Sequence, residues 1–179
     1  VLLFTESLGF ACWSMFPIVA RDVLGAGPVV LGFLSTFRSL GGIIGAITVS
    51  AAGDIKSKGW VLIGADIIFG MFLIFFAFSS NLVMSLALIM IVGAFGTTVS
   101  TISSTLAQTM APEEMRGRVM GLHGFITSSF GLGSLVMGTL ANFLGVSWAI
   151  AIGGASVSSN AIRSIPKAKI IGERSSSSQ

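Results

Sequence analysis

Long apolar runs separated by short polar breaks are the feature that most limits what this chain can fold into. Each run approaches the roughly 20 residues that an α-helix needs to cross a bilayer. Charged residues make up only 9% of the 179 residues, against about a quarter in an ordinary soluble domain. A soluble fold would need nearly every helix to be apolar on all sides. The sequence therefore predicts an all-α membrane protein with several spans.

Six spans are expected, because the breaks between the apolar runs are rich in turn-forming Gly, Pro, Asn and Ser. They cover approximately residues 1–19, 29–52, 60–79, 82–108, 119–140 and 144–162. The predicted six-helix transmembrane bundle occupies residues 1–162, and a polar tail at 163–179 is expected to be disordered. The first run lacks a basic n-region and a cleavage site, so we interpret it as a helix rather than a signal peptide. Because no initiator Met precedes it, we expect a fragment of a longer chain.

Basic residues gather on one side of the predicted bundle. Only Arg21 falls in a break on the other side. By the positive-inside rule, both ends of the chain are expected in the cytoplasm, with the spans in the inner or plasma membrane. Trp60 and Trp148 fall where the two interfacial aromatic belts are expected. The basic residues on the predicted inner side are Lys56, Lys58, Arg116, Arg118, Arg163, Lys167, Lys169 and Arg174.

Two predicted inner loops, "AAGDIKSKGW" and "APEEMRGR", share a charge pattern. In both, acids precede two basic residues that flank a single residue: Asp54, then Lys56 and Lys58, and Glu113 and Glu114, then Arg116 and Arg118. Acids interact favourably with a helix N-terminus, and Arg can hold a carboxylate bidentately. Such a cluster can join two helix ends in one conformation and release them in another; alternatively, it is topology-setting charge on a solvated turn. A nucleic-acid interface is disfavoured, since no basic face with interleaved aromatics surrounds RGR.

Four ionisable residues fall within the predicted spans, where a charge is costly and usually faces the interior or a watery cavity. The helical rise places Glu6 and Arg38 near mid-membrane on consecutive helices. We hypothesise that they face a central cavity, pair in some states, and contribute to cargo binding or proton coupling. The alternatives are a static buried ion pair, or an Arg38 that pairs outside this chain. Asp66 and His123 lie closer to the inner side.

The depth of Asp66 suits a gate, and its carboxylate could restrain Arg116 or Arg118. A histidine can change charge near neutral pH, which makes a proton role conceivable for His123. A hydrogen-bonded packing role is the more common use of a single histidine near an interface. Cys12 is the only cysteine, so it excludes an intramolecular disulfide and a cysteine-based metal cluster.

The fourth predicted span carries a polar face near its end. Thr97, Thr101, Ser104 and Gln108 recur at helical spacing. These side chains could line a water-filled cavity or bind cargo, or they could hydrogen-bond their own backbone or a neighbouring helix. Small residues four apart, at Gly41 with Gly45 and at Gly117 with Gly121, predict close helix approach in the second and fifth spans.

These features resemble the C-terminal six-helix half of a major facilitator superfamily transporter. That family's signature loop is approximately G-x-x-x-D-R-x-G-R-R, and "GDIKSKGW" is similar: Gly53 and Asp54 match, and Ile55 stands where the family often has Arg. "PEEMRGRVMGLHGF" resembles the loop between helices ten and eleven, especially in exporters of the siderophore and macrolide type, with Arg116, Gly117 and Arg118 as the match. "FPIVARDVLGAGPVVLGFLSTFRSLGGIIGA" looks like helices seven and eight of those exporters.

The resemblance implies half of a twelve-helix secondary transporter that exports small organic molecules, driven by protons, through alternating access. The implied partners are the lipid bilayer, small-molecule cargo, protons and an N-terminal six-helix half. An oligomeric membrane channel or a structural membrane subunit is the alternative. A membrane enzyme is disfavoured, because one His and one Cys, without HExxH or GxSxG, do not readily assemble a metal site or a nucleophile–base pair. No cofactor or metal is expected.

Overall fold

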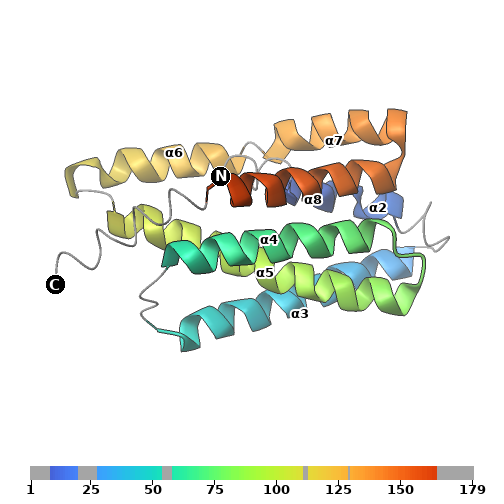
Figure 1. Cartoon of the computed structure of the whole chain (residues 1–179), viewed down its shortest axis with the longest axis horizontal. Coiled ribbons are helices and arrows are strands. Elements are labelled where there is room, and N and C mark those ends of the chain that lie inside the picture. Colours follow the sequence, from blue (N-terminus) through green and yellow to red (C-terminus); the bar gives the residue numbers. More distant parts are fainter. Residues whose placement is uncertain (1–8, 20–27, 54–57, 111–112, 129, 165–179) are drawn as a thin grey trace.

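The computed structural model describes residues 9–19, 28–53, 58–110, 113–128 and 130–164. Within these ranges all regular structure is helical, which confirms the all-α class. The long helices run roughly along the long axis of the molecule (Figure 1). The elements are η2 (Phe10–Met15), α2 (Phe16–Ile18), α3 (Pro28–Ala51), α4 (Lys58–Ala77), α5 (Leu82–Met110), η4 (Glu113–Met115), α6 (Arg116–Ser128), α7 (Phe130–Leu144) and α8 (Val146–Arg163).

Among the described residues, four stretches are long and apolar enough to cross a membrane: Pro28–Ala51, Gly59–Ala77, Leu82–Thr109 and Glu113–Leu144. The last of these holds α6 and α7, on either side of residue 129, which lies outside the description, and it covers the predicted span at 119–140. Helix α8 overlaps the predicted span at 144–162. The division into a six-span bundle and a tail stays a prediction.

The first predicted span differs most from the described structure. Residues 1–8 lie outside the description, and Phe10–Met15 forms a 3₁₀-helix rather than an α-helix. Pro17 follows in the three-residue α2. Proline has no backbone N–H, so it cannot donate the i→i−4 hydrogen bond that would continue an α-helix back to Trp13.

The helices pack in a consistent order. Helix α3 lies along α5, α5 lies along α4, and α4 lies along α8 (Figure 1). Helix α7 contacts both α8 and η2. The largest cluster of buried side chains joins α3, α4, α5, α7, α8 and the η2–α2 segment, and includes Phe16, Leu34, Phe69, Leu73, Phe76, Ile89, Val92, Met137, Ile150 and Val157.

Glycines bring the α3–α5 pair into close contact. A β-carbon at Gly41 would collide with the carbonyl oxygen of Met90, and one at Gly45 would collide with that of Ala94. The predicted close approach at these two glycines is therefore present. From the facing helix, a β-carbon at Gly93 would collide with the carbonyl oxygen of Arg38.

The other predicted glycine pair lies in a different environment. Among the residues that the structure describes, nothing lies within 4 Å of a β-carbon built at Gly117 or Gly121. Both glycines are exposed on α6. The small-residue spacing at this site therefore leaves an open helix surface within the described part of the chain.

Candidate transport pathway

Arg38 lies near the middle of α3, where it contacts the first described segment. Its guanidinium carbon is 4.4 Å from the centre of the Trp13 ring in η2. Its backbone carbonyl faces Gly93 of α5. Three elements therefore meet at this residue, and the guanidinium is half-buried. Glu6, its predicted partner, lies outside the described residues.

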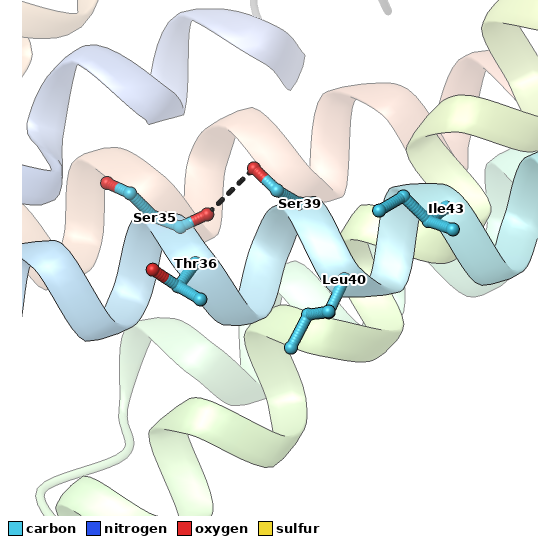
Figure 2. A pocket seen from close by; sticks show the side chains of 5 residues that line it. All are labelled: Ser35, Thr36, Ser39, Leu40 and Ile43. Carbon is cyan, nitrogen blue, oxygen red and sulfur yellow. Dashed lines mark hydrogen bonds between the residues drawn. The ribbon is translucent and has the colours of Figure 1, made fainter.

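A shallow pocket lies on the exposed side of α3, in the same stretch of helix as Arg38. Its volume is about 320 Å³, and Ser35, Thr36, Ser39, Leu40 and Ile43 line it (Figure 2). Figure 2 shows Ser35 and Ser39 on one side of the helix and Thr36 and Leu40 on another. The pocket is open, all five lining residues belong to α3, and it combines hydroxyl groups with apolar side chains.

The hydroxyls of this pocket are held by the helix itself. Thr36 Oγ1 donates to the carbonyl of Gly32 at 2.9 Å, and Ser39 Oγ donates to the carbonyl of Ser35 at 2.9 Å. Because their hydrogens point to the backbone, the two oxygens keep lone pairs that can accept hydrogen bonds. These hydroxyls are fixed in orientation and present acceptors to whatever enters the pocket.

The exposed side of α3 is mixed in chemistry. Only 17% of the apolar stretch of α3 is buried inside the protein, against 44% of the apolar stretch of α4. One stripe of this side is apolar, and the adjoining stripe carries the hydroxyls of Ser35 and Ser39. The apolar stripe consists of Val29, Phe33, Leu40, Ile43, Ile44 and Ile47.

The predicted polar face of α5 lies partly at the contact with α3. A β-carbon at Gly42 would lie 2.9 Å from Thr97 Oγ1, so this hydroxyl faces α3. Ser104 Oγ donates to the carbonyl of Thr101 at 2.9 Å, which is the backbone-bonded alternative for this side chain. Thr101 is half-buried and Gln108 is exposed.

The predicted gate residues fall in two environments. Glu113, Arg116, Gly117 and Arg118 are all exposed, on η4 and the first turn of α6. Asp66 of α4, in contrast, is only 1% exposed. In this structure the buried carboxylate and the exposed guanidinium groups therefore occupy different surroundings.

The second predicted gate loop is described only at its edges. Gly53 adopts φ 59°, in the left-handed region that favours glycine, directly after α3. Helix α4 begins at Lys58. Asp54 and Lys56 lie outside the described residues.

His123 lies on α6 and is half-buried. Its Nε2 atom is buried and has no hydrogen-bond partner in the described structure. The described residues contain no group of three His, Cys, Asp or Glu side chains that could hold a metal ion.

Two features of this region were not singled out from the sequence. Trp13 lies far from Arg38 along the chain, so no local pattern predicts that its ring contacts the guanidinium. The pocket hydroxyls did carry a signal. Ser35 and Ser39 are four residues apart in "LSTFRSL" and share a helix face, and their spacing could have identified the polar stripe.

The apolar helices define a multi-pass membrane protein. Residues 2–173 match the family described as transmembrane secretion effectors. The chain belongs to this family of major facilitator transporters. No solved structure matches the chain.

Two curated relatives are similar to the chain. The multidrug efflux pump Tap of Mycolicibacterium fortuitum is 32% identical over 120 residues, which is 66% of this chain and 29% of the relative. An uncharacterised MFS-type transporter of Methanocaldococcus jannaschii is 24% identical over 147 residues, 82% of this chain and 38% of the relative. The matched regions thus span about a third of the length of these relatives.

Proposed function

We propose that this chain is the C-terminal half of a secondary active transporter that exports small organic molecules. One observation carries the proposal: the middle stretch of an apolar helix bears both a charged residue, Arg38, which contacts Trp13, and a separate stripe of hydroxyl groups. A charge at this depth is costly in lipid and is normally directed to the protein interior or a water-filled cavity. Arg38 and the hydroxyl stripe would therefore face a cargo pathway.

The rest of the pathway would come from another six-helix half. The sparsely buried α3 and the open glycine surface of α6 supply area for such a neighbour. Transporters built from repeats hold their cargo near the midplane at the repeat interface. The matched regions cover only 29% and 38% of the two relatives, so these proteins are long enough to contain a second six-helix half.

The cargo class follows from the pocket and from similarity. The pocket offers hydroxyl acceptors beside Leu40 and Ile43, which favours amphipathic molecules. The similarity to a multidrug efflux pump supports export of such compounds. Within the family, the loop at Arg116–Arg118 favours the siderophore and macrolide exporter type.

Proton coupling is assigned to Glu6 and Arg38. In the described structure the Arg38 guanidinium contacts the Trp13 ring. In the proposed cycle, Arg38 pairs with Glu6 in some states and contacts Trp13 in others. Protonation of Glu6 would weaken its attraction to the guanidinium and favour a different helix arrangement. Thr97, Thr101, Ser104 and Gln108 would extend the polar path along α5.

The cytoplasmic gate is assigned to the two charged loops. Glu113, Arg116 and Arg118 are exposed and available to a neighbouring helix end, and Asp54, Lys56 and Lys58 would act in the same way. The positive-inside pattern supports a plasma-membrane location with both ends in the cytoplasm.

Transport by the full-length protein in proteoliposomes tests the proposal. An imposed pH gradient should drive movement of a fluorescent quaternary ammonium compound, which has no neutral form that could follow the gradient through protein-free vesicles, and collapse of the gradient should stop it. Arg38→Gln should reduce the rate at least tenfold, while Arg174→Gln, in the polar C-terminal sequence, serves as the matched control. Movement that ignores the gradient would point to a channel, and unchanged transport in Arg38→Gln would remove this residue from the pathway.

A further inference from the structure

Aromatic side chains mark both ends of the outward face of the α4–α8 pair. Trp60 and Phe78 are both exposed and lie 18 residues apart, with Trp60 inside α4 and Phe78 just after its end. Eighteen residues are five full helical turns, so both side chains point to the same side, about 27 Å apart along the axis. Phe78 makes an edge-to-face contact with Trp148 of α8, with ring centres 5.5 Å apart. This spacing is close to the roughly 30 Å thickness of the hydrocarbon core.

Helices α4 and α8 are antiparallel, and their contacts fix which residues are level. Gly70 packs against Gly154. One turn along, Ser158 Oγ donates to the carbonyl of Ile67 at 3.4 Å. One further turn along, Ile63 and Ala161 share a small buried cluster. Continued for another turn, this register brings Trp60 level with Arg163.

Arg163 is also on the outward side. It follows Trp148 by 15 residues, about four turns, so it returns to the same side of α8. Its side chain is exposed, as is that of the neighbouring Ile162. The end of the pair that holds Trp60 therefore presents an indole, a guanidinium and apolar side chains on one face.

The charged residues at this end of the two helices themselves are basic. Lys58 begins α4, so a second basic residue lies in the same end of the pair. Asp66 is the only acid in the sequences of α4 and α8. It is buried and about two turns farther into the membrane than Trp60. No acid on these two helices therefore competes with an anion for the exposed guanidinium.

We propose that this end of the α4–α8 pair is a binding site for an anionic phospholipid. Arg163 binds the phosphate, for which a guanidinium is well suited. Trp60 lies at the glycerol level, where interfacial indoles are preferred. The acyl chains lie along the exposed apolar side chains of the pair, including Val61, Phe75 and Ile162. The match between the aromatic spacing and the bilayer favours lipid over a second copy of the chain as the occupant.

Native mass spectrometry of the full-length transporter tests this site. The protein in a non-ionic detergent is titrated with dioleoyl phosphatidylglycerol and, separately, with dioleoyl phosphatidylcholine. The phosphatidylglycerol should bind more tightly. Arg163→Gln should lower its affinity about fivefold, the effect of one cation near an anionic lipid surface, and leave phosphatidylcholine binding unchanged. Arg163→Lys should keep most of the affinity.

Two aromatic variants locate the site along the helix pair. Trp60→Leu should lower retention of phosphatidylglycerol, whereas Trp148→Leu, at the opposite end of the same face, should not. Equal binding of the two lipids by the unmodified protein overturns the proposal, and this comparison requires no variant to fold. Equal losses of phosphatidylglycerol binding in Trp60→Leu and Trp148→Leu would also overturn the proposal. A dimer that forms without lipid and that Arg163→Gln dissociates would overturn it as well.

Discussion

The guanidinium of Arg38 lies over the ring of Trp13, with its central carbon 4.4 Å from the ring centre. This contact joins α3 to the 3₁₀ segment η2, while Gly93 of α5 lies against the backbone of the same residue. A cation over an aromatic face gains about 0.5–2 kcal/mol, with the larger values at desolvated sites. The contact therefore joins a charge in the middle of α3 to the first described segment.

Trp13→Leu should release Arg38 and couple energetically to its replacement. A double-mutant cycle with Arg38→Gln, read from thermal unfolding in detergent, should give a coupling energy of about 0.5–2 kcal/mol. Trp13→Phe keeps an aromatic face and should therefore lose less stability than Trp13→Leu. Strictly additive single and double variants would show that the contact contributes nothing to stability.

Gly41→Ala should destabilise the α3–α5 pair. The added methyl group meets the carbonyl oxygen of Met90, and overpacking of this kind typically costs about 1–3 kcal/mol. Gly64→Ala is the matched control, because within the described chain nothing lies within 4 Å of its β-carbon position. There the higher helix propensity of alanine should stabilise by up to about 1 kcal/mol. Thermal unfolding of both variants measures the two changes in stability. Equal changes in Gly41→Ala and Gly64→Ala would contradict the close contact between α3 and α5.

Asn81 should stabilise the start of α5 as its N-cap. Its Oδ1 accepts a hydrogen bond from the backbone N–H of Val83 at 3.0 Å, satisfying a donor left open at the helix start. Asn81→Ala should cost about 1 kcal/mol, and Asn81→Asp should retain the cap. Hydrogen exchange of the first turn of α5 would measure the difference, and unchanged protection in the alanine variant would exclude this role.

Neutralising Arg116 and Arg118 should shift the balance between inward- and outward-open states. Both side chains are exposed at the beginning of α6, close in sequence to Glu113, so charge removal would act on the proposed gate rather than on the buried core. Labelling of single cysteines placed on the two sides of the membrane would report the shift. Replacement of both by Lys keeps the charge and should restore much of the original balance. The same labelling pattern in all variants would leave these arginines with a topological role.

The fold class was predictable because run length and hydropathy are local properties. Gly41 and Gly45 were also correctly interpreted as a close helix contact. The same spacing at Gly117 and Gly121 did not meet a neighbour within the described residues, because a small-residue pattern permits an approach without supplying the partner. The Arg38–Trp13 contact was not predictable, since it depends on how two separate elements pack.

The predicted first span shows where local patterns are insufficient. Its apolar run predicts an α-helix, but Phe10–Met15 forms a 3₁₀-helix. Pro17 follows directly in α2, where it cannot donate a backbone hydrogen bond to the preceding turn. Apolar composition identifies a run that can lie in a membrane, but it does not choose between these two kinds of helix.

The contact between Gly70 and Gly154 leaves no space for a side chain at either of these two positions. A β-carbon on Gly70 would lie 2.5 Å from the carbonyl oxygen of Gly154, and one on Gly154 would lie 2.6 Å from that of Gly70. A larger residue at either position forces α4 and α8 apart, and once they are apart the glycine at the other position has no remaining advantage. We therefore expect the two positions to covary among homologues, so that natural variation itself would record how closely these helices pack.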